Sequence, residues 1–260
     1  MKGLRQRVLA GDVVSGCFLG LGSTLATELC AQTGLDWVVL DLEHGGLGEA
    51  GLTHHLQAIE GTPAAGLVRV ESAERVRVHR ALDASAEGIM FPRIDTPEQA
   101  ERAVAAMRYP PQGVRGVARL NRACRFGAEF DAYVAGAADL LLGIMQIESL
   151  EGVKNAAAIA GVDGVDVLFV GPLDLSFSLG VPGRFEDPEF REALGQVADA
   201  ARRAGVCAGI LLPRAEDAEF YLDLGYRFIG IGSDGGWLSA AARRTAAGFQ
   251  ETRQRRVRNR

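Results

Sequence analysis

Residues 37–44 are Trp37-Val38-Val39-Leu40-Asp41-Leu42-Glu43-His44, and Gly45-Gly46 follows directly. Apolar residues open this stretch and turn-forming residues lie on both sides of it, which predicts a buried parallel strand. The stretch then ends in two carboxylates and an imidazole. We interpret it as an active-site strand of an α/β enzyme; the alternative is a solvated loop that is acidic without a catalytic role.

The same pattern recurs along the chain: a helical segment, a glycine, and then a short β-rich run. The predicted strands are Val14–Leu19, Trp37–Asp41, Gly66–Val70, Gly88–Phe91, Leu140–Ile147, Val165–Val170, Cys207–Leu211 and Phe228–Ile231. Eight strands that alternate with helices in about 250 residues favour a single (β/α)8 TIM barrel, an α/β fold, over an open doubly wound sheet. We expect residues 1–260 to form this one domain, with a basic tail from about residue 250.

Several helix ends are marked locally. Thr96-Pro97-Glu98-Gln99 combines an N-cap, a proline at the first helical position and a capping-box glutamine. Asp187-Pro188 is a similar start, and Ser72 and Ser149 are predicted N-caps directly after strands. Left-handed glycines are predicted to close helices at Gly34, Gly61, Gly88, Gly161, Gly205 and Gly225.

Composition limits the class of protein. The chain is 48% hydrophobic and 23% charged, which is typical of a soluble globular domain. No apolar run approaches the roughly 18 residues of a membrane span, and the N-terminus lacks an apolar signal segment, so we expect a cytoplasmic protein without a membrane partner. Four cysteines lie far apart and never as Cys-x-x-Cys, which argues against a zinc ribbon or a redox pair.

Charge argues against a nucleic-acid partner. The net charge is −5, although five arginines lie within residues 253–260; the remaining chain has 23 basic and 33 acidic residues. An acidic body is a poor platform for nucleic acid. The basic tail is expected to be a frayed, solvated terminus, with an interaction role as the alternative. Complete dinucleotide-binding or P-loop fingerprints are also lacking.

Polar residues follow several predicted strands, at the end where barrel enzymes place their catalytic groups. Glu148 and Asp174 follow separate strands and form a natural site for a hard divalent cation such as Mg²⁺. His44 is a candidate general base, with a third metal ligand as the alternative. Arg69 could stabilise a carboxylate or oxyanion, or form a salt bridge with Glu71 or Asp41.

The connection from Arg108 to about Gly127 is unusually long. Long irregular loops in compact domains are commonly functional. Its arginines could place positive charge near the barrel mouth or at a subunit contact, or could simply cover a surface. They are Arg115, Arg119, Arg122 and Arg125.

In combination these motifs resemble the HpcH/HpaI aldolases, pyruvate-dependent class II aldolases such as 4-hydroxy-2-oxoheptanedioate aldolase. The resemblance runs from about Leu4 to Thr245. The motifs that carry it are Asp41-Leu42-Glu43-His44, Val68-Arg69-Val70, the Arg108-Tyr109-Pro110-Pro111 to Arg115-Gly116 loop, Gln146-Ile147-Glu148, Gly171-Pro172-Leu173-Asp174-Leu175-Ser176 and Gly232-Ser233-Asp234.

The resemblance implies an aldehyde-lyase that reversibly cleaves 4-hydroxy-2-oxo acids to pyruvate, or hydroxypyruvate, and an aldehyde. The reaction would use Mg²⁺, Mn²⁺ or Co²⁺ and a metal-stabilised enolate. The chain has only two lysines, Lys2 and Lys154, which argues against a Schiff-base mechanism.

The resemblance also assigns roles to residues. His44 would be the base, Arg69 the stabiliser of the enolate, and Asp41 the partner that orients His44. Asp83, from a neighbouring subunit, would raise the basicity of that histidine. Glu148 and Asp174 would hold the metal. The residues assigned to substrate are Gln146, Gly171, Leu173 and Asp174, where Leu173 and Asp174 act through backbone N–H groups.

Relatives of this family form hexamers, trimers of dimers that exchange the C-terminal helix, which here would be Trp237–Gly248. Two departures concern substrate identity: Phe91-Pro92-Arg93 replaces an apolar motif, and Gly45-Gly46 replaces the Ala-Pro of many relatives. Two other functions remain open. One is acyl-CoA lyase, citrate-lyase-β-like or synthase chemistry on the same barrel, and the other is a non-catalytic protein that binds 2-oxo acids.

Overall fold

Eight parallel strands close into a barrel in sequence order, and the last strand pairs with the first. The computed structural model describes residues 3–212 and 215–258. The strands are β1 (Val14–Leu19), β2 (Trp37–Asp41), β3 (Ala65–Arg69), β4 (Gly88–Phe91), β5 (Leu142–Ile147), β6 (Val167–Val170), β7 (Cys207–Leu211) and β8 (Tyr226–Ser233). The predicted (β/α)8 fold is confirmed. Four strands have the predicted bounds, and the other four shift at their ends by one or two residues.

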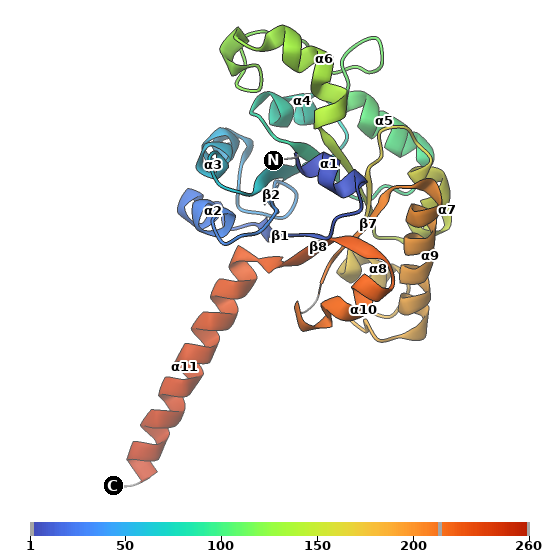
Figure 1. Cartoon of the computed structure of the whole chain (residues 1–260). Helices are drawn as coiled ribbons and strands as arrows, with labels where there is room; N and C mark the ends of the chain where they lie inside the picture. The colour runs from blue at the N-terminus through green and yellow to red at the C-terminus, as the bar shows by residue number, and fades with distance from the viewer. Residues whose placement is uncertain (1–2, 213–214, 259–260) are drawn as a thin grey trace.

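Helices surround the barrel (Figure 1). They are α1 (Leu4–Leu9), α2 (Thr24–Ala31), α3 (Leu52–Ile59), α4 (Arg75–Asp83), α5 (Pro97–Met107), α6 (Phe130–Leu140), α7 (Leu150–Ala160), α8 (Pro172–Ser178), α9 (Pro188–Ala204), α10 (Ala218–Asp223) and α11 (Asp234–Arg258). Short 3-10 turns lie at η1 (Glu49–Gly51), η2 (Arg125–Gly127) and η3 (Ala215–Asp217). None of the helices within the described ranges is both long and apolar enough to cross a membrane.

Most of the local signals act as predicted. The Thr96 side chain accepts from Gln99 N–H, and the Gln99 side chain accepts from Thr96 N–H, which completes the capping box. Ser149 and Asp187 also cap their helices. Ser72 is not an N-cap, because α4 begins at Arg75 and the Ser72 hydroxyl instead accepts from the N–H of Glu74.

Two of the glycines predicted to close helices in a left-handed conformation do not adopt it, although Gly161 does cap the end of α7. Gly161 has helical dihedral angles, with φ of −77°. Gly88 is the first residue of β4, where a Cβ atom would lie only 2.6 Å from the Leu142 carbonyl oxygen. Gly88 is therefore required for the close approach of β4 to β5, and the prediction of a left-handed cap at this position is wrong.

Aromatic side chains fill the interior of the barrel. The Trp37 indole stacks on the Phe228 ring, with centroids 4.4 Å apart and planes 9° apart, and Phe18 packs edge-on against Trp37. A Cβ atom at Gly16 would overlap Trp37, so glycine makes room for the indole. Phe18 lies at the end of this cluster closest to Arg69, whose Cζ is 5.1 Å from the ring centroid. The cluster thus forms the apolar floor of the barrel mouth.

The long loop after α5 lies at the N-terminal end of the barrel. Helix α5 follows β4 and runs back toward the N-terminal ends of the strands, so its last residue delivers the loop there. Arg115 pairs with Asp83 at the end of α4, and Arg122 donates to the Ala84 carbonyl. The prediction that these arginines lie near the barrel mouth is therefore wrong for the chain's own barrel. A subunit contact stays a prediction.

Helix α11 projects away from the barrel (Figure 1). Its first residue, Asp234, is buried, whereas residues 236–258 are exposed. The exposed residues include Trp237, Leu238 and Phe249. The helix continues to Arg258, so the basic tail that we expected to be frayed is helical over most of its length. Exchange of this helix between subunits stays a prediction.

Candidate active site

Asp41 and Arg69 are register partners at the C-terminal ends of the paired strands β2 and β3. Arg69 donates from Nε to Asp41 Oδ1 at 2.9 Å and from Nη2 to Oδ2 at 2.7 Å. Both side chains are buried. Burial by itself would raise the pKa of Asp41, but the hydrogen bonds and charge of Arg69, with two main-chain N–H groups, lower it below its ordinary value. Asp41 is therefore a fixed carboxylate that orients the guanidinium.

Asp41 also closes the turn that carries His44. Its Oδ1 accepts from the main-chain N–H of Glu43 at 3.1 Å and of His44 at 3.2 Å. A side chain at Gly45 would overlap the Asp41 carbonyl, and Gly46 N–H donates to Gly20 O at 2.7 Å. The glycine pair therefore permits a sharp turn beside Asp41, from which the largely exposed His44 side chain extends.

Glu43 lies between the two groups that the sequence proposes for chemistry. Its Oε2 is 3.1 Å from Arg69 Nη1 and 3.7 Å from His44 Nε2. Burial raises the pKa of Glu43, an effect that the charges of Arg69 and His44 partly offset. Sequence reasoning left Glu43 without a role. The sequence signal that could have indicated a role for Glu43 was its spacing of two residues from Asp41. Its contact with Arg69 on the neighbouring strand can be seen only in the folded chain.

Glu148 follows β5 and lies in a buried polar setting. It accepts from the main-chain N–H of Arg93 at 2.8 Å and from Gln146 Nε2 at 3.2 Å. Burial, followed by the negative charges of Asp174 and Glu43, raises the pKa of Glu148 to about 7. The main-chain contact of Arg93, a residue with φ of +48°, was not predicted.

The start of α8 lies against this carboxylate. Gly171 is the N-cap of α8, and a Cβ atom there would overlap Glu148 Oε2. Asp174 follows in the first turn, and both it and Leu173 are exposed. The fold thus brings Gln146, Glu148 and the Gly171–Asp174 segment together at one side of the barrel mouth.

Glu148 and Asp174 are the residues predicted to hold a divalent cation, and their chemistry suits one. Within the described residues, no group of three or more His, Cys, Asp or Glu side chains is arranged to hold a metal. Mg²⁺ usually takes one or two protein carboxylates and completes its octahedron with water and substrate oxygens. The negative charge of Asp174 repels that of Glu148 and helps to raise the pKa of Glu148. A bound cation would neutralise both charges and remove this repulsion. Gln146 Oε1 is buried without a hydrogen-bond partner among the described residues, which leaves a polar acceptor beside this pair.

Comparison with known proteins agrees with this geometry. A family model described as HpcH/HpaI aldolase/citrate lyase matches residues 14–241, a range that contains the whole barrel. The chain belongs to the HpcH/HpaI family. The family resemblance drawn from the motifs is therefore confirmed.

Several known proteins match this chain over nearly their whole length. A hydroxypyruvate/pyruvate aldolase of Chromohalobacter salexigens is 41% identical over 246 residues, covering 94% of this chain and 96% of the relative. A 5-keto-4-deoxy-D-glucarate aldolase of Klebsiella pneumoniae is 38% identical, covering 95% and 96%. The solved structure of an HpcH/HpaI aldolase/citrate lyase family protein from Burkholderia cenocepacia has a TM-score of 0.90 and 39% identity, covering 96% and 98%. These matches confirm the prediction of a carbon–carbon lyase of the aldolase type.

Within one chain, Asp83 lies away from the other predicted site residues. It is the last residue of α4, at the N-terminal end of the barrel, and it pairs with Arg115 at 3.0 Å. Arg115 is almost fully buried, and its Cζ lies 4.5 Å from the Tyr109 ring centroid and 5.3 Å from that of Tyr133. Asp83 therefore does not join the site of its own chain, and the role in a neighbouring subunit that the resemblance implies stays a prediction.

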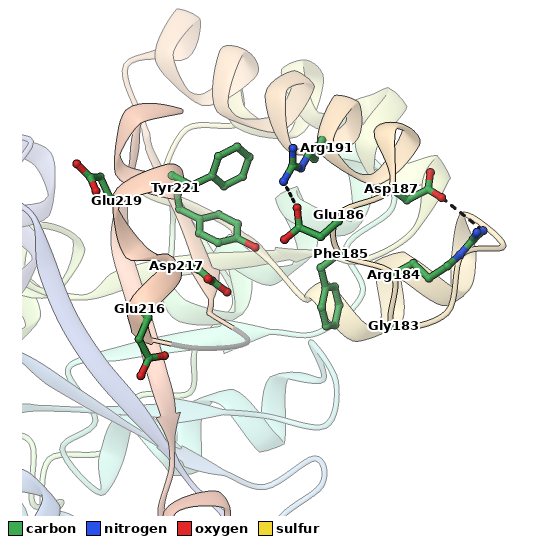
Figure 2. Close-up of a pocket in the computed structure, with 11 residues that line it drawn as sticks. Gly183, Arg184, Phe185, Glu186, Asp187, Arg191, Glu216, Asp217, Glu219 and Tyr221 are labelled. Carbon is green, nitrogen blue, oxygen red and sulfur yellow. Dashed lines mark hydrogen bonds and ion pairs between the residues drawn. The ribbon is translucent and has the colours of Figure 1, made fainter.

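A cavity of about 1010 Å³ in this family member lies outside the predicted site. Figure 2 shows it between the connection that precedes α9 and the start of α10. Four of its charged residues form two pairs, Glu186 with Arg191 and Arg184 with Asp187. Since none of the predicted catalytic or metal-binding residues lines it, cavity volume alone does not locate the chemistry.

Proposed function

We propose that the chain is a divalent-metal-dependent aldolase that reversibly cleaves 4-hydroxy-2-oxo acids to pyruvate, or hydroxypyruvate, and an aldehyde. The observation that carries the proposal is the pairing of two halves at one barrel mouth. Asp41, Arg69 and His44 lie on the β2–β3 side of the mouth. Glu43 connects this side to the two carboxylates opposite: the charge of Asp174 raises the pKa of Glu43, and the charge of Glu43 raises the pKa of Glu148. The names of the two aldolase relatives support the choice of substrate class.

Glu148 and Asp174 are the residues that would hold the cation, which we propose to be Mg²⁺, Mn²⁺ or Co²⁺. When bound, a divalent cation supplies Lewis-acid polarisation of the ketone and carboxylate oxygens of a 2-oxo acid. Gln146 donates to Glu148 and so orients it, while its Oε1, which has no hydrogen-bond partner in the described part of the chain, is available to substrate.

The start of α8 is the proposed place for the substrate carboxylate. The first N–H groups of a helix have no acceptor within the helix and favour negative charge. Here these are the backbone groups of Leu173 and Asp174, because Pro172, the first helical residue after Gly171, has no N–H. Because Gly171 has no side chain, substrate can approach both the backbone and Glu148.

The proton and electron movements follow from the other half of the site. His44 takes the proton of the 4-hydroxyl group, the C3–C4 electron pair moves into the enolate of pyruvate, and the aldehyde leaves. Arg69 stabilises the negative charge that develops on the enolate oxygen. Asp41 occupies Nε and Nη2 of Arg69 with one bond each, so other guanidinium N–H groups stay available to substrate. Return of the proton to C3 completes pyruvate.

We propose a hexameric assembly, a trimer of dimers, in which residues 237–248 of α11 are exchanged. The projecting helix α11 leaves the apolar side chains of Trp237, Leu238 and Phe249 exposed, and a neighbouring subunit could cover them. Asp83 would then serve the site of a neighbouring subunit. The cytoplasm is the proposed location.

A pyruvate-release assay over a panel of 4-hydroxy-2-oxo acids tests the function. We expect activity that is lost in EDTA and restored by Mg²⁺, Mn²⁺ or Co²⁺. Turnover that survives complete chelation would overturn the metal role. A product formed only with an acyl-CoA would favour lyase or synthase chemistry, and binding of 2-oxo acids without any turnover would favour a non-catalytic protein.

A further inference from the structure

One carboxylate oxygen lies between two proposed catalytic groups. Glu43 Oε2 is 3.1 Å from Arg69 Nη1 and 3.7 Å from His44 Nε2. The Arg69 side chain is 11% exposed, that of Glu43 23% and that of His44 68%, so Glu43 lies between a buried cation and an open imidazole. The proposed chemistry of the site assigns nothing to this residue.

Glu43 completes the hold on Arg69. Asp41 accepts from Nε and Nη2, which leaves Nη1 as the guanidinium nitrogen without an Asp41 contact. Glu43 faces that nitrogen, and Phe18 lies 5.1 Å from Cζ. Asp41 fixes Nε and Nη2 by hydrogen bonds, and Glu43 adds an ion pair at Nη1, so each guanidinium nitrogen faces a carboxylate. The direction of the remaining N–H groups is thereby set before substrate arrives, which is what electrostatic preorganisation requires.

The charges suggest a second role. Asp41 already neutralises Arg69 through a bidentate ion pair, so the charge of Glu43 is surplus in the resting site. The charged groups that interact with Glu43 are Arg69, His44, Asp41, Asp174 and Glu148. Proton transfer to His44 creates a positive charge 3.7 Å from Glu43 Oε2, and a carboxylate at that distance stabilises it.

We propose that Glu43 is a positioning residue of the aldol reaction. It holds the Nη1 end of Arg69 and acts as counter-ion to His44 after that residue takes the proton of the 4-hydroxyl group. No bond to Glu43 forms or breaks, and the proton stays on His44 until it is returned to C3. This role rests on the proposed aldolase function.

Glu43→Gln is the direct test, because it keeps the shape of the side chain and removes its charge. We expect kcat to fall about 10- to 100-fold and KM for the 2-oxo acid to change less than about 3-fold, since the groups proposed to bind substrate in the ground state are unchanged. Glu43→Asp should recover part of kcat, because it restores the charge.

Glu49→Gln is the matched control. Glu49 lies six positions further along the chain and pairs with Arg77 at 3.1 Å and with Arg80, both on α4. We expect wild-type kcat in this variant. A Glu43→Gln enzyme with wild-type kcat, or one that loses kcat no more than Glu49→Gln, would overturn the proposal.

A readout without turnover separates this inference from the proposed function. In ¹⁵N NMR of the arginine side chains, rotation about the Cζ–Nη bonds of Arg69 should be faster in Glu43→Gln than in wild type. Unchanged rotation would show that Glu43 does not hold Arg69. If wild type releases no pyruvate from any substrate, the proposed function fails while this comparison still decides whether Glu43 positions Arg69.

Discussion

Asp41 and Arg69 face each other across β2 and β3 and are joined by two hydrogen bonds, of 2.9 Å from Nε and 2.7 Å from Nη2. Both groups are buried, so bulk water cannot solvate one of them if its partner is removed. Breaking such a pair by removal of one charge costs about 3–5 kcal/mol, because the partner stays buried without compensation. The pair therefore links the stability of the fold to the catalytic role that we propose for Arg69.

Asp41→Asn should lower both. The amide retains one oxygen acceptor but places an NH₂ group against Arg69, so the guanidinium loses its fixed direction. We expect kcat to fall by about 100-fold or more, in line with the loss of an oxyanion-stabilising donor. Steady-state kinetics and thermal unfolding measure the two effects.

Asp36→Asn is the control for that substitution. Asp36 directly precedes the same strand at its opposite end and also pairs with an arginine, Arg7, at 2.7 Å. It should lose some stability and keep wild-type kcat. Equal loss of kcat in the two variants would mean that the Asp41 effect arises from general weakening of β2.

The lowered pKa of Asp41 predicts how stability depends on pH. A carboxylate whose folded pKa lies below its unfolded value contributes stability above the unfolded pKa, and this is lost as pH falls through the folded pKa. The difference in unfolding free energy between wild type and Asp41→Asn should therefore be constant from pH 7 to pH 5 and shrink below about pH 4. Urea unfolding at several pH values measures this difference. A constant difference down to pH 3 would contradict the prediction.

The opposite sign applies to Glu148. Its pKa is raised from 4.5 to about 7 by burial and by the charge of Asp174, so the folded protein binds the proton more tightly than the unfolded chain. Without metal, stability should therefore fall as pH rises from about 4.5 to 7, by at most about 3 kcal/mol. Thermal unfolding in EDTA should show this fall in wild type and lose it in Glu148→Gln. If the wild-type profile matches that of the variant, the surroundings of Glu148 do not raise its pKa.

Much of the fold could be predicted because its signals are local. Strand bounds such as Trp37–Asp41 follow from apolar runs between turn residues, and the Thr96 capping box lies within four consecutive residues. The prediction of a helix cap at Gly88 is wrong, because glycine is needed there to leave space for Leu142, a residue distant in sequence. Of the places predicted for the arginines of the Arg108–Gly127 loop, only the mouth of the chain's own barrel is wrong, because the position of the loop depends on the direction of α5.

The candidate site was predictable only in part for the same reason. Strand ends identified Arg69, Glu148 and Asp174 because parallel strands in a barrel deliver their C-terminal residues to one face. Distances between strands are not encoded in spacing along the chain. The ion pair of Glu43 with Arg69 and the bond from Arg93 N–H to Glu148 could therefore be found only in the folded protein.

Gly171 provides a test of the proposed metal site that leaves every charged group in place. A Cβ atom at this position would overlap Glu148 Oε2, and Glu148 is held from the other side by the N–H of Arg93 at 2.8 Å. The carboxylate therefore cannot move away without breaking a hydrogen bond. We expect Gly171→Ala to weaken Mn²⁺ binding by about 10-fold or more, as measured by isothermal titration calorimetry.

Gly195→Ala is the matched glycine control, because Gly195 lies within α9 and an added Cβ atom there meets nothing within 4 Å. This variant should bind Mn²⁺ as wild type does and be more stable by about 0.5–1 kcal/mol, since alanine favours helix. If Gly171→Ala binds Mn²⁺ as tightly as Gly195→Ala, the cation does not use Glu148 in the orientation that the fold imposes. The assignment of Glu148 as a metal ligand would then have to be abandoned.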